Sequence, residues 1–349
     1  MNDYLKSIKR DLWVSLQGLE KPAAVQRSSA YIEWIDAELT EIVKRYLLSS
    51  NLSESKFIRA LNKIYRTERF DVLLKKYLVD YLFDLFNLMY DYSYGKAERA
   101  IALEDNPLNR FAFLAFSEKF NPPLKVAWYP PRRKSARGLG LVWLAKNILS
   151  GSLKGGLRLS GPGGKFKVMR EAIWGLYGLG GKYFHDDFMV DGEKIRPQDL
   201  LLYSRGIPTE TGRLKGYQDA RRSAYAHFDL WRLQLGLKPL LRRIIPRYLL
   251  RGLLSLAVEL NSENYSLYFS LFNYFTGVAL PYEKLFSNYE VASEFGHSYF
   301  SASHVVEAII CQNHRTKYYL IHWSDNSVGA DKYLLSFLGC DKFLLWGEA

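Results

Sequence analysis

Residues 295–349 decide the fold class of this chain, and their sequence is FGHSYFSASHVVEAIICQNHRTKYYLIHWSDNSVGADKYLLSFLGCDKFLLWGEA. Residues 295–301 are rich in aromatic side chains, an apolar-periodic run follows Ser303, and residues 317–322 are aromatic and β-branched again. These patterns predict a strand, a helix capped at Ser303 and a second strand, and a short helix over 332–338 and a further strand over 342–346 follow. A strand, helix and strand in this order form a βαβ unit, so the sequence favours an α/β fold with a parallel sheet.

The predicted second strand runs directly into five side chains rich in hydrogen-bond donors and acceptors: His322, Trp323, Ser324, Asp325 and Asn326. Open α/β sheets bind ligands at the carboxyl ends of their strands, so this loop is predicted to be the functional site. His322 is the best candidate for a general acid or base, because a histidine titrates near neutrality and a neighbouring carboxylate such as Asp325 can raise its pKa. The alternative is an Asx turn of Asp325 and Asn326 that His322 merely satisfies.

The N-terminal part of the chain has a helical pattern. Apolar side chains recur at steps of three and four residues over 31–47 and again after a predicted cap at Ser53. A long and very apolar helix is predicted over 70–94. We therefore expect an all-helical segment up to about residue 104, within a helical region that spans residues 1–121.

The middle of the chain predicts further strands at 124–129, 199–204 and 226–230. The first of these is expected to open the α/β domain. Helices are predicted over 141–149 and 167–176. They lie among glycine-rich segments, whose GLGL and GPGGK sequences match neither complete phosphate-loop motif, so flexible loops are favoured over an anion-binding site.

A basic and apolar segment, residues 238–259, predicts a helix that carries Arg243, Arg247 and Arg251 at four-residue steps. Such a helix can lie in a membrane interface. It can equally pack against the core and leave its basic face in solvent. Both interpretations stay open from the sequence.

Composition limits the class of protein. The chain has 349 residues, of which 48% are hydrophobic and 24% charged, as in a globular protein of about two domains. Two cysteines are too few for a disulfide framework and lack zinc-finger spacing. The histidines between His297 and His322 have no metal-ligand spacing on one helix face, so no metal is expected. The low cysteine content favours a reducing, cytoplasmic setting. Neither a signal peptide nor a spanning segment is predicted, so the chain is not expected to be integral to a membrane.

The net charge of +12 directs the chain toward polyanions or anionic surfaces. A nucleic-acid binder, a peripheral membrane enzyme and a protein that handles phosphorylated sugars would all satisfy this charge. Short nucleic-acid motifs such as RNP1, KH loops and zinc fingers are missing from the sequence, so no nucleic-acid partner is expected. Peripheral contact with the inner face of an anionic cell membrane is kept as an option.

The ending HWSDNSVGADKYLLSFLGCDKFLLWGE resembles the first half of bacterial surface-carbohydrate glycosyltransferases of the GT-B kind, which build capsule or O-antigen. These are related to polysaccharide-synthesis and glycerophosphotransferase-like enzymes. In that family one strand ends in a His-Trp-Asp-Asn type motif and a later strand ends in a Trp-Gly-Glu type motif. The matching residues here are His322, Trp323, Asp325, Asn326, Trp346, Gly347 and Glu348. The resemblance covers about residues 199–349 and leaves out the helical N-terminus.

The resemblance implies a Rossmann-like parallel-sheet domain over residues 122–349, as the first half of a GT-B fold. It implies metal-independent transfer of a sugar from a nucleotide donor to a glycan or lipid-linked acceptor, with no cofactor besides the donor substrate. His322 would be the base and Asp325 its orienting partner. The substrate-binding candidates are His304, Trp323, Ser324 and Asn326.

One departure from the family concerns the donor. In a GT-B enzyme the nucleotide sugar lies mainly on a second domain, and this chain ends where that domain would begin. We therefore expect either a truncated product or a separately encoded partner, and donor-binding residues are not assigned. The rival interpretation is a non-catalytic binding or scaffold subunit.

Overall fold

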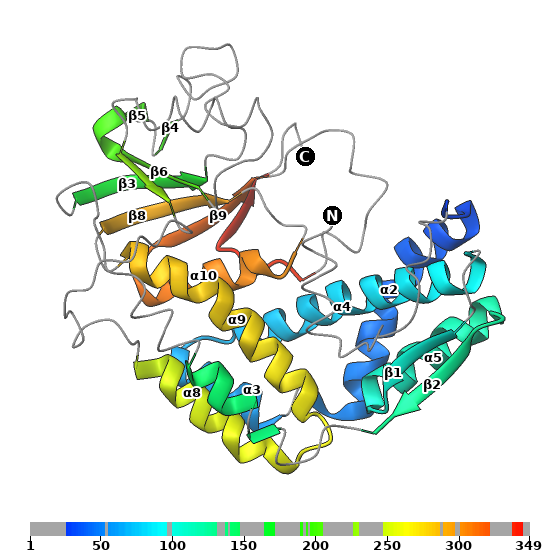
Figure 1. Ribbon diagram of the computed structural model, residues 1–349. Helices are drawn as coiled ribbons and strands as arrows, with labels where there is room; N and C mark the ends of the chain where they lie inside the picture. The colour runs from blue at the N-terminus through cyan, green and yellow to red at the C-terminus, as the bar shows by residue number, and fades with distance from the viewer. Residues whose placement is uncertain are drawn as a thin grey trace.

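Figure 1 shows a computed structural model of the chain. The structure describes residues 26–52, 55–95, 100–130, 137–138, 140–146, 164–171, 189–190, 193–194, 196–204, 226–229, 247–286, 289–296, 301–321 and 337–344. These residues form a helical N-terminal part and a six-stranded sheet with helices against it (Figure 1). The predicted α/β class is confirmed.

All strand pairs in the large sheet are parallel. In space the strands lie in the order β10-β9-β8-β3-β6-β7. The chain thus builds outward on one side of β3 through β6 and β7, and then returns to the other side of β3 with β8. The strands are β3 (Gly164–Glu171), β6 (Leu200–Ser204), β7 (Ala226–Asp229), β8 (Tyr289–Gly296), β9 (Lys317–Ile321) and β10 (Lys342–Leu344).

Several predicted strands are confirmed in this sheet, namely those at 199–204, 226–230, 317–322 and 342–346. The strand predicted over 295–301 lies earlier, as β8, and ends at Gly296. A small antiparallel pair, β4 (Met189–Val190) and β5 (Glu193–Lys194), and a 3-10 turn, η2 (Pro197–Asp199), precede β6. The helix predicted over 332–338 lies largely outside the described residues.

The helices α9 (Tyr265–Phe286) and α10 (Ser303–Asn313) pack against one face of the sheet (Figure 1). Before α9 come α8 (Arg247–Val258) and the 3-10 turn η3 (Glu259–Asn261), so α8 and α9 form a helical hairpin. The helix predicted after Ser303 is confirmed, although Ala302 occupies the N-cap position and no cap side-chain bond forms there. Within the described part of the chain, no helix combines the length and the apolar character needed to cross a bilayer.

The N-terminal part contains α2 (Ser29–Ser50), α3 (Lys56–Tyr65), α4 (Arg69–Tyr94) and α5 (Pro107–Phe120). Side-chain caps fix the starts of α2, α3 and α5. The Ser28 hydroxyl caps α2 by accepting the Tyr31 amide at 3.2 Å. Ser55 caps α3, so the predicted cap at Ser53 was wrong. The long helix predicted over 70–94 is confirmed as α4.

Three predictions need correction. The N-terminal part is not all helical, because β1 (Ala100–Glu104) pairs in parallel with β2 (Lys125–Tyr129) in a separate two-stranded sheet. The strand predicted at 124–129 therefore exists, but it does not open the large sheet. The strand that opens the large sheet is β3. It covers the start of segment 167–176, where a helix was expected. The physical reason is that Met169 is buried between two neighbouring strands, which favours extended backbone.

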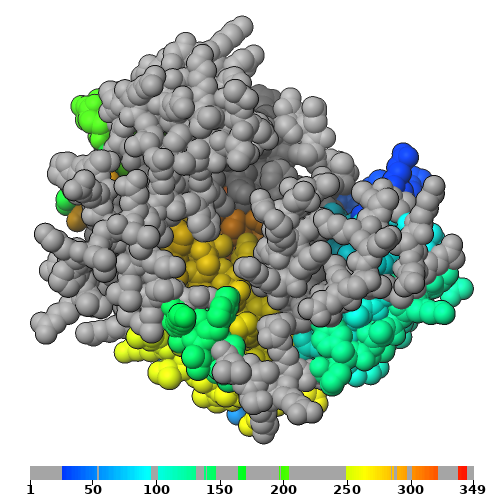
Figure 2. All heavy atoms as spheres, in the orientation of Figure 1, coloured from blue at the N-terminus to red at the C-terminus, as the bar shows by residue number. Residues whose placement is uncertain are grey.

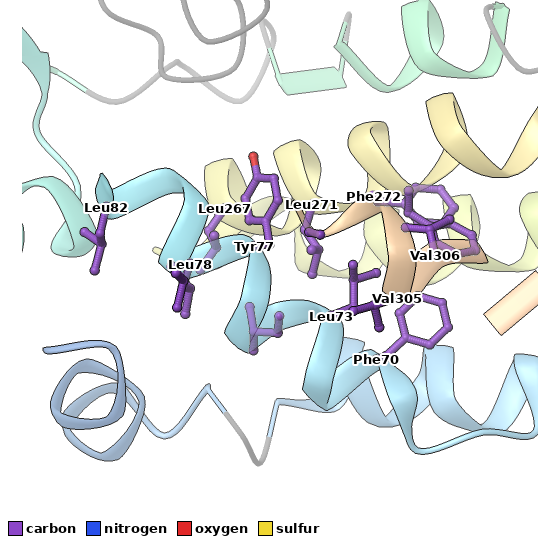
Figure 3. Packing of buried hydrophobic residues seen from close by; sticks show 14 of the residues in the cluster. Phe70, Leu73, Tyr77, Leu78, Leu82, Leu267, Leu271, Phe272, Val305 and Val306 are labelled. Atoms are coloured by element: carbon purple, nitrogen blue, oxygen red, sulfur yellow. The ribbon is translucent and has the colours of Figure 1, made fainter. Parts of the chain in front are cut away.

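The helical part and the sheet share one hydrophobic core. Figure 3 shows side chains of α4, α9 and α10 meeting there, among them Phe70, Leu73, Leu271, Phe272, Val305 and Val306. Polar contacts fix the same junction: the Arg69 guanidinium donates to the Ala308 carbonyl at 2.8 Å and pairs with Asp341. A domain boundary between residues 121 and 122 stays a prediction.

Candidate functional site

The candidate site lies where β8 ends and α10 begins. Because all strands of the large sheet are parallel, their carboxyl ends meet at one edge. The order of the strands reverses between β3 and β8, and open α/β sheets bind ligands in the crevice that such a reversal creates. The end of β8 and the first turn of α10 therefore hold the position in this fold at which a ligand is expected.

The predicted loop that follows β9 lies outside the described residues. This applies to His322, Trp323, Ser324, Asp325 and Asn326, the catalytic pair and three substrate-binding candidates. The described chain reaches Ile321, the last residue of β9. The roles assigned to these five residues stay predictions.

His304, the remaining candidate, lies in the first turn of α10 and is fully buried. Its Nδ1 atom is 2.6 Å from the Ser301 carbonyl oxygen. Since a carbonyl only accepts, Nδ1 carries the proton and Nε2 is the free lone pair. Nε2 makes no hydrogen bond of standard geometry, although the backbone of Phe337 lies close to the ring.

Burial lowers the pKa of His304 to about 3, and the nearby Lys76 cation adds to this effect. The ring is therefore neutral at physiological pH. A neutral, buried imidazole can accept a hydrogen bond through Nε2, but it offers no cationic donor to a phosphate. Whether His304 contacts a substrate stays a prediction.

Two charged residues from α4 complete this end of α10. A carboxylate oxygen of Asp80 accepts the Ala302 amide at 2.7 Å, which places a negative charge at the positive end of the helix dipole. Lys76 lies one turn earlier on α4, with its Nζ atom 3.9 Å from Asp80. The site thus brings together a buried cation, a carboxylate and an imidazole.

Burial sets the protonation of this pair. Burial raises the pKa of Asp80 to about 6, against the opposing effects of the Lys76 charge and the Ala302 hydrogen bond. Burial also lowers the pKa of Lys76, which the Asp80 charge partly offsets. The sequence analysis missed both residues. Their signal was a Lys and an Asp four residues apart on a helix predicted to be buried.

A second polar network lies beneath the sheet, between β6, β8, α9 and α10. The Tyr203 hydroxyl donates to the buried Glu294 at 2.6 Å and accepts from Tyr282 at 3.0 Å. The Cys311 thiol donates to the other Glu294 oxygen at 2.8 Å. Burial and the Glu294 charge raise the pKa of Cys311, so this thiol stays protonated and is a poor nucleophile. The network fastens the sheet to its helices.

A related contact lies next to this network. The Tyr318 hydroxyl of β9 donates to the buried Glu307 of α10 at 3.0 Å. The half-buried Asp80 and the buried Glu294 and Glu307 thus each have an identified donor. In the part of the chain that the structure describes, no three His, Cys, Asp or Glu side chains gather closely enough to hold a metal ion.

The arrangement suits a polar ligand at the carboxyl edge of the sheet, near the reversal between β3 and β8. Its described chemistry consists of one neutral imidazole and one largely buried Lys–Asp pair. Comparison of the chain with protein-family models, with curated protein sequences and with solved structures found no match.

Proposed function

We propose that the six-stranded sheet is a Rossmann-like domain and the acceptor-side half of a GT-B glycosyltransferase of surface-polysaccharide biosynthesis. The observation that carries this proposal is the strand order. Numbered by their place in the chain, the six parallel strands lie 3-2-1-4-5-6 across the sheet. This is the order of the doubly wound fold that binds nucleotides at its point of reversal.

The resemblance of the chain's ending supplies the chemistry. His322 acts as the base and takes the proton from a hydroxyl group of the acceptor. The freed oxygen attacks the anomeric carbon of the nucleotide sugar as the bond from that carbon to the phosphate oxygen of the nucleotide breaks. The products are a new glycosidic bond and the free nucleotide, which is a nucleoside diphosphate from a UDP- or GDP-sugar and CMP from a CMP-sugar.

The other candidates position the reactants. Asp325 orients the imidazole of His322 and stabilises its protonated form. Trp323 stacks on a sugar ring, while Ser324 and Asn326 supply hydrogen bonds to its hydroxyl groups. His304 accepts a hydrogen bond through Nε2. No metal or further cofactor takes part in the proposed step, and the nucleotide sugar is a substrate.

Sugar transfer measured on the full gene product tests the proposal. A panel of UDP-, GDP- and CMP-sugars is offered with lipid-linked and free glycan acceptors. If His322 is the base, His322→Ala lowers turnover by roughly 10² to 10⁴. The melting temperature should stay within a degree or two of the parent's, because a catalytic base contributes little to stability.

A second histidine provides the matched control. His314 lies 2.9 Å from Glu283 and stacks on Phe286, at the opposite end of α10 from the candidate site. His314→Ala is expected to lower stability and leave the turnover of folded protein unchanged. A His322→Ala protein that is destabilised but fully active removes His322 from the mechanism. Glycan binding without transfer of any sugar on the panel supports the non-catalytic binding subunit instead.

A further inference from the structure

One face of α8 carries apolar side chains into solvent. Leu254 is 68% exposed and Val258 is 81% exposed, and Leu250 lies one turn before them on the same face. Residues at four-residue steps line one side of a helix. The opposite side of α8, with Leu249 and Leu256, is fully buried in the core. The helix is thus apolar on both its buried and its exposed side.

A second segment, residues 140–146, has the same property. Val142 is 66% exposed and Trp143 is 48% exposed, while the adjacent Leu144 is buried. Lys146 at the end of the segment is exposed as well. A tryptophan beside a lysine is typical of side chains that anchor a protein in the interface of a bilayer.

Both segments rest on the same helix. A Cβ atom added at Gly140 would lie 3.4 Å from the Phe269 ring of α9. One added at Gly252 of α8 would meet the ring of Phe272, one turn further along α9. Figure 2 shows the segment around residue 140 in green and α8 in yellow, side by side on one face of the molecule. We call these two segments together the α8 face.

The charge of the surrounding sequence is one-sided. Between Glu118 and Glu171 the chain holds 12 Lys and Arg residues and no acidic residue. Residues 238–258 hold Lys238, Arg242, Arg243, Arg247 and Arg251 and no acidic residue before Glu259, which directly follows α8. Of these, Arg251 is exposed on α8, next to the apolar side chains. Both segments of the α8 face therefore lie in basic, acid-free stretches of a chain with a net charge of +12.

We propose that the α8 face docks on an anionic lipid bilayer. Binding is stabilised when exposed leucine, valine and tryptophan side chains enter the acyl boundary, because this removes apolar surface from water. Neighbouring arginine and lysine residues are attracted to anionic headgroups. A nucleic acid would satisfy the positive charge, but its phosphate backbone offers nothing to the exposed apolar side chains. The combination of the two kinds of side chain therefore favours the lipid surface.

Vesicle co-sedimentation tests this proposal. Vesicles of phosphatidylcholine alone are compared with vesicles that also contain phosphatidylglycerol. The parent protein should sediment with the anionic vesicles, and less so as salt is added. The double variant Leu254→Ser/Val258→Ser should bind the anionic vesicles about tenfold more weakly or worse, because two apolar side chains no longer enter the bilayer.

The control removes equally exposed apolar side chains elsewhere. Leu48 on α2 and Leu114 on α5 are both exposed. Both lie in the N-terminal part of the chain, outside the α8 face. The double variant Leu48→Ser/Leu114→Ser should bind vesicles like the parent. Melting temperatures of both double variants should match the parent's, since none of the four side chains is buried.

Fluorescence supplies a second readout. Insertion of Trp143 should shift the emission of the protein to shorter wavelength on addition of anionic vesicles, and Trp143→Phe should remove most of that shift. The proposal is overturned if the α8 variant binds as well as the parent, if neutral and anionic vesicles bind equally, or if the protein binds RNA or DNA and no vesicles. None of these measurements needs sugar transfer, so their failure leaves the proposed function untouched.

Discussion

Replacing His304 is expected to make the stability of the protein less sensitive to pH. In the folded protein the ring is buried beside Lys76, and its pKa falls from 6.5 to about 3. The unfolded chain binds a proton at this residue below about pH 6.5. Between these two pKa values the unfolded state holds a proton that the folded state refuses. His304 therefore contributes stability above pH 6.5, and that contribution is lost as the pH falls toward 3.

The expected loss follows from the two pKa values. Between pH 7.5 and 5.0, protonation of the unfolded chain at His304 lowers the free energy of unfolding by about 2 kcal/mol. Asp80 acts in the opposite sense, because its pKa is raised from 3.8 to about 6. Its folded form takes up a proton first, so its contribution is lost as the pH rises from 4 to 6. A comparison of two proteins that both keep Asp80 isolates the His304 effect.

The assay is urea unfolding of the parent, His304→Asn and His304→Leu at pH 7.5, 6.5, 5.5 and 5.0. Neither asparagine nor leucine titrates, but asparagine keeps an N–H donor for the Ser301 carbonyl and leucine does not. In both variants the free energy of unfolding should no longer fall by the about 2 kcal/mol that the linkage relation gives for His304 between pH 7.5 and 5.0. His304→Leu should be less stable than His304→Asn by about 1 to 3 kcal/mol at every pH, because leucine leaves the Ser301 carbonyl unpaired.

Parallel stability curves for the parent and His304→Asn would refute this reasoning. They would mean that His304 binds its proton equally well in the folded and the unfolded chain. The ring would then be solvated rather than buried beside Lys76, and a protonated His304 would be able to donate a hydrogen bond to an anionic ligand.

Further predictions concern the packing and the network beneath the sheet. Gly252→Ala should destabilise the protein by about 1 to 3 kcal/mol, because a Cβ there would lie 2.6 Å from the Phe272 ring. Gly277→Ala, also on a helix but with open space around it, should stabilise by about 0.5 to 1 kcal/mol; equal effects in urea unfolding would contradict the close α8–α9 approach. Tyr203→Phe should cost about 1 to 3 kcal/mol, because Glu294 loses a buried donor. A melting temperature equal to the parent's would show that water or another group replaces that hydroxyl.

Local sequence patterns were enough for elements whose character is local. The apolar periodicity of α4 and the aromatic, β-branched run of β9 predicted both elements. The strand β3 was missed, although Lys165 and Lys167 alternate with Phe166 and Val168 there. The glycine-rich sequence before it and the apolar sequence after it suggested a helix between loops. Its role as the central strand depends on β6 and β8, which no local pattern shows.

The sequence also did not predict which strands and side chains pair with one another in space. The strand at residues 125–129 was predicted. Its pairing with β1 was not, because that pairing depends on the path of the chain through α5, which connects the two strands. The cluster of Asp80, Lys76 and His304 joins residues that are 222 positions apart at the Asp80–Ala302 contact. Local sequence patterns cannot predict a contact between residues so far apart in the chain. The proposed catalytic pair, by contrast, comes from a motif resemblance, and its test is chemical.

The place of β3 at the centre of the sheet has a consequence for synthesis on the ribosome. Its partner β8 emerges roughly 120 residues later, which at about 5 to 20 residues per second is a wait of about 6 to 24 s. During that interval one edge of the nascent central strand has no partner, and open strand edges pair readily with other chains. Slowed translation after β3, or depletion of the chaperones that bind nascent chains, should therefore lower the yield of this protein more than that of proteins whose central strands pair early.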